Sequence, residues 1–94
     1  MSTSFYFLAV PESMDHNDGL TAHMSTGAAN ELLDIILPGW DKQHGTVGII
    51  LRHQLRGCLS RIKPLLDKAP SRETKHLAAV LFAAEMMGGD VIFG

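Results

Sequence analysis

The chain has few of the features that mark secreted, membrane-bound or zinc-stabilised proteins. It contains one cysteine, Cys58, so it cannot form an internal disulfide, and no Cys-x-x-Cys or Cys/His pattern indicates structural zinc. No apolar run approaches the roughly 20 residues that cross a bilayer, and the N-terminus lacks the basic stretch and longer apolar segment of a secretory signal. We therefore expect a reducing, cytoplasmic setting and no membrane partner.

Motifs of catalysis and cofactor binding are also missing. The glycines between residues 45 and 57 match no nucleotide-binding fingerprint, no Gly-Lys-Ser/Thr sequence is present, and no serine lies in a Gly-x-Ser-x-Gly elbow. Cys58 lies between Leu55 and Leu59 on an apolar stripe, which is typical of a buried structural thiol rather than a nucleophile paired with one of the histidines. These absences favour a non-catalytic protein without a cofactor.

The densest group of possible metal ligands is the run Asp15-His16-Asn17-Asp18, with His23 close behind it. Carboxylate and imidazole groups suit a hard-to-borderline divalent cation. The run lacks the alternating acidic ligands and terminal glutamate of an EF-hand, and no His-Glu-x-x-His helix is present. A solvated turn is therefore favoured over a metal site made by Asp15, His16, Asp18 and His23, although the sequence leaves ion binding there open.

Composition favours one folded domain that spans residues 1–94. Hydrophobic residues make up 46% of the 94 residues and charged residues 19%, which is typical of a globular protein and not of a disordered one. The net charge of −2 gives no overall attraction to nucleic acid. Residues 1–44 hold six acids and one base (−5), and residues 45–94 hold seven bases and four acids (+3). The two halves can therefore attract each other, within one subunit or between two.

The first half of the chain predicts a strand, a loop and a helix. Residues 3–10 are rich in aromatic and β-branched side chains and stop at Pro11, so they predict a strand that is apolar on both faces. Residues 11–24 are polar and contain Asn-Asp-Gly, which predicts a loop. A helix capped by Ser25 or Thr26 is expected to run to about Leu37, because a proline follows.

The second half predicts two more helices and a terminal strand. Residues 46–62 carry an apolar stripe at helical spacing, and Pro64 is expected to end or kink that helix. Residues 46–51 alone also fit a buried strand, but the pattern continues too far for one. A third helix follows a cap at Ser71 and ends at Gly88-Gly89, and residues 91–93 predict a short strand. Together these elements predict an α+β domain of order β-α-α-α-β, with three helices packed on short strands from the two chain ends.

Three stretches carry a resemblance. They are the Phe-Leu-Ala-Val-Pro-Glu strand end, the helix start Met24-Ser-Thr-Gly-Ala-Ala-Asn30 with the Leu-Leu pair after it, and the closing Gly88-Gly89-Asp-Val-Ile-Phe-Gly94. The chain resembles a group of small uncharacterised bacterial and bacteriophage proteins. The resemblance implies a bacterial or phage origin and a small helical domain, and it implies no activity and no site residue.

Two groups of side chains are candidates for a contact surface. Arg52, Arg56 and Lys63 can line one side of the second helix and meet phosphates, an acidic protein surface or the chain's own acidic half. An ordinary solvated face is favoured over these roles, and an acidic protein surface over nucleic acid. Tyr6 and Trp40 are residue types enriched at interface hot spots, with Met86-Met87 as an adaptable pair. Trp40 can equally cap the core beneath its loop.

These features predict a non-catalytic protein-interaction or regulatory accessory protein that acts through its surface. We also expect a homodimer, because the two terminal strands alone make a marginal sheet that helices or a second subunit must complete. The alternatives are a nucleic-acid-binding accessory protein that uses the basic face of the second helix, and a small metal-dependent enzyme.

Overall fold

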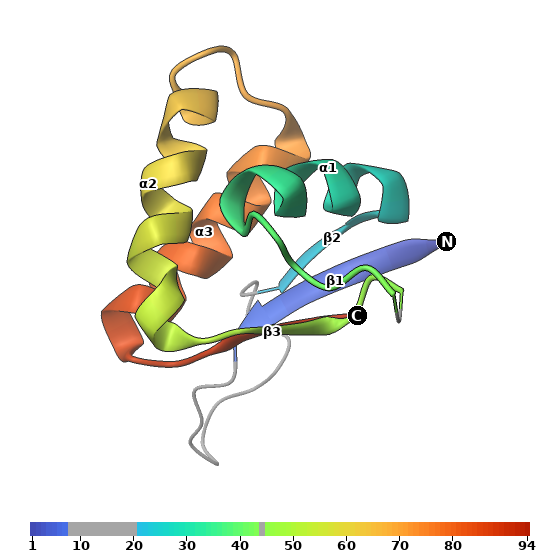
Figure 1. Cartoon of the computed structure of the whole chain (residues 1–94). Helices are drawn as coiled ribbons and strands as arrows, with labels where there is room; N and C mark the ends of the chain where they lie inside the picture. Colours follow the sequence, from blue (N-terminus) through green and yellow to red (C-terminus); the bar gives the residue numbers. More distant parts are fainter. Residues whose placement is uncertain (8–20, 44) are drawn as a thin grey trace.

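The predicted α+β class is confirmed by the computed structural model, which describes residues 1–7, 21–43 and 45–94 (Figure 1). Three helices lie on the same side of a four-stranded sheet, and the strands at both chain ends belong to that sheet. The elements follow the order β1 (Ser2–Phe7), β2 (Thr21–Ser25), α1 (Thr26–Ile36), β3 (Gly48–Ile50), the 3₁₀ turn η1 (Arg52–Gln54), α2 (Leu55–Leu66), α3 (Arg72–Met87) and β4 (Val91–Phe93).

The sheet is antiparallel throughout, and its strands lie in the order β2-β1-β4-β3. The two terminal strands, β1 and β4, are therefore the central pair, with Phe5 opposite Phe93. Main-chain hydrogen bonds extend this pairing past β4, because Ser4 and Gly94 exchange N–H···O bonds of 3.0 and 3.1 Å. The expected strand at residues 3–10 is confirmed as far as Phe7, and residues 8–10 lie outside the described chain.

Side chains on one face of the sheet form the core with the helices. The inward residues of the strands alternate with outward ones, as the twofold period of a strand requires. Each helix contributes one apolar stripe to the same interior. The largest fully buried side chains are Phe5, Leu33, Ile36, Ile50, Leu55, Ile62, Leu77, Val80, Leu81 and Val91.

Two predicted helices are confirmed to within a residue, because their ends carry local signals. The hydroxyl of Ser25 accepts a hydrogen bond from the Ala28 N–H at the start of α1. Ser71 does the same for Thr74 at the start of α3. Helix α3 ends at Gly88, whose φ of +74° is a left-handed conformation that glycine adopts without strain.

The prediction of a loop over residues 11–24 was wrong for its last part, because Thr21–Ser25 form β2. The inward residues of β2 are Ala22 and Met24, which are buried against the helices and lie opposite Phe5 and Thr3 of β1. In the sequence, only these two alternating apolar side chains indicated a strand, and the strand forms because it pairs with β1. The predicted Asn-Asp-Gly turn lies outside the described residues.

The prediction of a helix from Thr46 was also wrong over residues 47–54, which form β3, a short connection and the turn η1. Helix α2 starts at Leu55 and continues through Pro64 to Leu66, so of the two outcomes expected at the proline, an end or a kink, the end is excluded. Residues 48–50 form a strand instead of a helix because Ile50 is fully buried opposite Val91, and because Gly48 leaves room for the ring of Phe93. The rejected alternative, a buried strand in this stretch, was the better interpretation.

Candidate functional site

The outward face of the sheet is the first candidate site. No helix of the described chain lies on this face (Figure 1). One row of directly opposed residues crosses all four strands: Thr21 pairs with Tyr6, Tyr6 with Ile92, and Ile92 with Ile49. Tyr6 is 41% exposed and Ile49 is 51% exposed, while Ile92 is half-buried between them. The register thus aligns an aromatic and two branched aliphatic side chains into an apolar row, which we call the sheet-face row.

Polar groups lie beside the sheet-face row on the strands β1 and β2. The Ser4 hydroxyl and Nδ1 of His23 are 2.6 Å apart, in a hydrogen bond that is exposed on this face. The main chain of Ser4 also exchanges hydrogen bonds with that of Gly94, the residue that follows β4. In the described part of the chain, His23 has no carboxylate partner of the kind that completes a Ser-His-Asp triad. The pair therefore supplies a polar border and not a recognisable nucleophile.

The second candidate site contains two of the three basic residues that the sequence suggested for a contact surface. Arg52 and Arg56 line a cavity of about 290 Å³ between the start of α2 and the end of α3. Nε of Arg56 donates to Oε1 of Glu85 at 2.9 Å, and Nη1 of Arg52 donates to the Gly88 carbonyl oxygen at 3.3 Å. Both side chains therefore tie α2 and η1 to the C-terminal end of α3. Lys63 is exposed farther along α2 and does not line this cavity.

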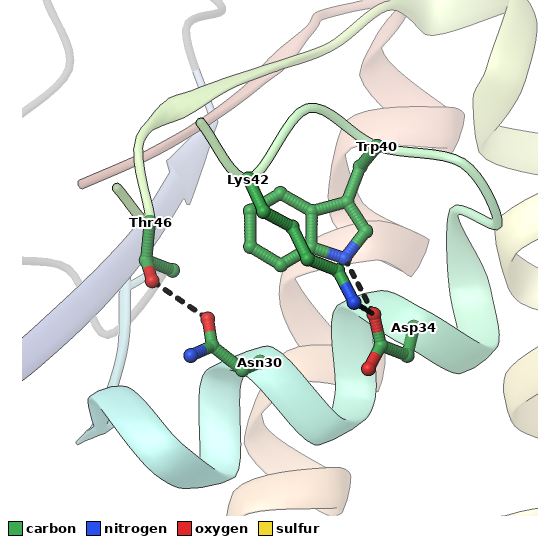
Figure 2. A network of polar contacts seen from close by, with 5 residues as sticks. All are labelled: Asn30, Asp34, Trp40, Lys42 and Thr46. Carbon is green, nitrogen blue, oxygen red and sulfur yellow. Dashed lines mark hydrogen bonds and ion pairs between the residues drawn. The ribbon is translucent and has the colours of Figure 1, made fainter. Parts of the chain in front are cut away.

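The third candidate, Trp40, is held by α1 and by the core (Figure 2). Its indole N–H donates to Oδ1 of Asp34 at 2.9 Å, and Nζ of Lys42 lies 2.6 Å from the same oxygen. Its ring meets the Phe93 ring edge-on, with centroids 6.1 Å apart, and the Lys42 ammonium lies 5.6 Å from the indole centroid. The structure thus gives Trp40 the contacts of a core cap, which is one of the two roles that the sequence left open.

Electrostatics around Trp40 support the same structural role. The Lys42 ammonium, and after it the Trp40 N–H, hold the pKa of Asp34 below its usual range because both stabilise the carboxylate. A second side-chain contact, from the Thr46 hydroxyl to Oδ1 of Asn30 at 2.6 Å, fastens the other end of the connection to α1 (Figure 2). The segment between α1 and β3 is therefore anchored at two points on one helix.

The remaining predicted site residues do not gather into a reactive centre. Cys58 is fully buried, and burial raises the pKa of its thiol, against a smaller opposing effect of the Arg61 charge. Of the four possible metal ligands, Asp15, His16 and Asp18 lie outside the described residues, and His23 bonds to Ser4. Within residues 1–7, 21–43 and 45–94, no group of three or more His, Cys, Asp or Glu side chains is placed to hold a metal ion.

Sequence reasoning found Tyr6 but missed Ile49 and Ile92, its neighbours in the sheet-face row. Outward alternation was readable for each strand separately, but the row exists only because the strand register brings these residues opposite one another. No helix in the described ranges is long and apolar enough to cross a membrane. Comparison with protein-family models, curated proteins and solved structures finds no significant match to this chain.

Proposed function

We propose that this protein is a non-catalytic interaction module that binds a protein partner through the outward face of its sheet. The observation that supports this proposal is the sheet-face row, in which Tyr6, Ile92 and Ile49 lie directly opposite one another on three strands. The helices already cover the other face, so these side chains are not needed for the core. A surface with an apolar centre and a tyrosine is typical of a protein interface.

The border of the row fits the same role. Thr21, Ser4 and His23 supply hydroxyl and imidazole groups next to the apolar centre. Protein interfaces commonly surround a desolvated centre with polar groups that stay near water and fix orientation. The partner we propose therefore presents apolar side chains to the row and hydrogen-bonding groups to the β1–β2 side.

Nucleic-acid binding through Arg52, Arg56 and Lys63 has weaker support. Arg56 is paired with Glu85, and Nη1 of Arg52 is bonded to the Gly88 carbonyl, so both guanidinium groups already have partners within the chain. Lys63 lies apart from them, so the three residues do not form one basic surface. Nucleic-acid binding would show affinity that falls steeply with added salt. We also propose a cytoplasmic setting and a bacterial or phage origin, on the grounds given by the sequence. The homodimeric state stays a proposal without its original ground, because β2 and β3 complete within one chain the sheet that was expected to need helices or a second subunit.

Affinity capture from a bacterial lysate tests the sheet face. The test variant is Tyr6→Thr/Ile49→Thr, which keeps β-forming residues and removes two exposed side chains of the row. The matched control is Ile35→Thr, because Ile35 on α1 is 41% exposed, as Tyr6 is. A third variant, Arg52→Glu/Arg56→Glu, tests the basic residues.

The proposal expects a prey that the wild type and Ile35→Thr capture and that Tyr6→Thr/Ile49→Thr does not. A prey lost only with Arg52→Glu/Arg56→Glu would move the site to the cavity between α2 and α3. The interaction hypothesis fails if no variant, including the wild type, captures anything.

A further inference from the structure

Strand β3 is the last strand on its side of the sheet, and the exposed side chains along it are apolar. Val47 before the strand, Ile49 within it and Leu51 after it alternate along the chain, and they are 55%, 51% and 43% exposed. No charged residue lies between positions 45 and 51. Exposed edge strands are usually protected from pairing by charged residues or proline. The strand at the opposite edge differs, since the outward residues of β2 are threonine, histidine and serine.

The hydrogen-bond pattern of the sheet turns the main-chain groups of Ile49 away from β4. Ser4 and Gly94 exchange both bonds of one pair between β1 and β4. Bonding alternates along an antiparallel strand, so the next residue, Phe93, bonds to the other neighbour, β3. The partner of Phe93 is Gly48. Ile49 follows Gly48 in the chain, and it therefore directs its N–H and its C=O toward the open edge.

The neighbours of Ile49 along this edge already use their N–H groups within the chain. The N–H of Val47 donates to the Gly45 carbonyl oxygen at 3.0 Å, and the N–H of Leu51 donates to Oε1 of Gln54 at 2.9 Å. In the described part of the chain, the N–H and C=O of Ile49 have no such partner. The unpaired donor and acceptor of the edge thus lie at one defined residue, which fixes the point where a further strand can bond.

A cavity of about 320 Å³ lies beside this point. Residues directly opposed in a sheet have side chains on the same face, so a residue added opposite Gly48 places its side chain on the face that carries Phe93. Ligand cavities measure roughly 300–1,000 Å³, so this one is large enough for a single bulky side chain. Its lining combines the edge of β3 with the connection after α1 and with β4: Gly48 and Ile49, Leu37, Trp40 and Asp41, and Phe93.

We infer that β3 binds an extended segment of a partner protein, which adds a fifth strand to the sheet and inserts one apolar side chain into the cavity beside Gly48. The inference deepens the proposed interaction function and rests on it. The unpaired N–H and C=O of Ile49 indicate this occupant, because a second main chain in extended form supplies both complementary groups. The added strand also extends the sheet-face row by one residue beyond Ile49.

Phage display of random dodecapeptides on the immobilised full chain supplies the probe. The selected peptide is then N-methylated at one amide at a time, and each form is titrated into the protein. Trp40 is the single tryptophan of the chain and lines the cavity, so its emission reports binding. Alternate amides of an added strand point toward β3. Methylation is therefore expected to weaken binding about 10-fold or more at the amide that meets Ile49, and hardly at the two amides beside it.

Two variants of one residue separate the main chain from the side chain. Ile49→Pro removes the N–H that points away from β4, and proline is tolerated at edge positions of this kind. Ile49→Ala also shortens the side chain, but it keeps the N–H. Ile49→Pro is expected to bind the peptide about 10-fold more weakly than Ile49→Ala, at a similar urea midpoint. If Ile49→Pro does not fold, the methylation scan with the wild type decides the question.

Amide hydrogen exchange tests whether the edge is open. The N–H of Ile49 is expected to exchange fast in the chain alone and to be protected by the peptide. Protection in the chain alone, from a second copy or from its own residues, overturns the inference. A selection that yields no binding peptide, or a methylation scan without alternation, overturns it as well.

Capture from the bacterial lysate separates this inference from the proposed function. If Tyr6→Thr loses the captured partner while Ile49→Pro and Ile49→Ala bind it equally, the sheet face stands and the added strand does not. If Ile49→Pro loses a partner that both Ile49→Ala and Tyr6→Thr retain, the strand site stands and the site moves from the sheet face to its edge.

Discussion

Replacement of Gly48 by alanine is expected to destabilise the protein, because the new methyl group has no space. A Cβ built at Gly48 lies 2.9 Å from Cζ of Phe93 and 3.4 Å from both of its Cε atoms. Phe93 is only 2% exposed. Its ring contacts two other aromatic rings, that of Phe5 with centroids 5.6 Å apart and that of Trp40 with centroids 6.1 Å apart. The ring therefore cannot move away without disturbing two further aromatic side chains.

The size of the effect follows from two opposing contributions. Overpacking of a well-filled core costs about 1–3 kcal/mol. Removal of a glycine from a strand interior returns roughly 0.5–1 kcal/mol, because alanine loses less conformational freedom on folding. The net loss is about 1 kcal/mol, within a range of roughly 0–2.5 kcal/mol. For a domain of this size, each kcal/mol lowers the melting temperature by about 4–8 °C.

Urea and thermal unfolding followed by circular dichroism measure this loss. Another glycine-to-alanine change serves as the control. No atom lies within 4 Å of a Cβ built at Gly27 in α1. This control is expected to be neutral or to stabilise its helix by up to about 1 kcal/mol.

A double-mutant cycle separates the clash from other effects. In a Phe93→Leu background, the cost of Gly48→Ala should largely disappear, because the ring that the methyl group meets is gone. If Gly48→Ala is as stable as the wild type in both backgrounds, the ring of Phe93 is not held as the structure shows. The reason given above for a strand at residues 48–50 would then be wrong.

Three further predictions concern single residues. Because Lys42 and Trp40 lower the pKa of Asp34 in the folded protein, its carboxylate stabilises the fold above about pH 4, and this contribution is lost as the pH falls through the lowered pKa. The difference in urea midpoint between the wild type and Asp34→Asn should therefore shrink on acidification. A difference that stays constant with pH would refute this role of Asp34. Cys58 should react with a thiol reagent at pH 8 only as fast as the chain opens, so urea should accelerate labelling, and immediate labelling of native protein would contradict its burial. Ser71→Ala should lower stability by about 1 kcal/mol in urea unfolding through loss of the α3 cap, whereas an unchanged midpoint would show that the cap contributes little.

The parts of the fold that sequence predicted are those determined by near neighbours. The starts of α1 and α3 depend on Ser25 and Ser71, each of which bonds to a backbone group three residues away. The end of α3 depends on Gly88 itself. Signals of this kind are complete within a few residues, so no knowledge of the rest of the chain is needed to interpret them.

The parts that it missed depend on contacts between distant residues. Residues 46–51 satisfy both the helical and the strand pattern, and the contact of Gly48 with Phe93 near the other end of the chain decides between them. The same is true of the candidate site. Alternation placed Tyr6 on one face of its strand, but only the pairing of β1, β4 and β3 brings Ile92 and Ile49 beside it. Strand register is a property of the assembled sheet.

Side-chain partners also changed the meaning of residues that were predicted individually. Arg52, Arg56 and Lys63 suggested one basic stripe on a helix, but Arg52 lies in η1, before α2 begins. It turns toward the Gly88 carbonyl, while Arg56 turns toward Glu85. The positions of these basic residues in the sequence did not show which of them pair with acidic or carbonyl groups elsewhere in the chain.

The most direct test of a functional sheet face compares binding with stability in one variant. The captured partner, once purified, is titrated against the wild type and Tyr6→Thr/Ile49→Thr, and the urea midpoint of each chain is measured beside its dissociation constant. Loss of a tyrosine hot spot predicts affinity at least about 30-fold weaker at an almost unchanged urea midpoint. Equal affinity for both chains, with the same midpoints, would contradict a role for Tyr6 and Ile49 in binding.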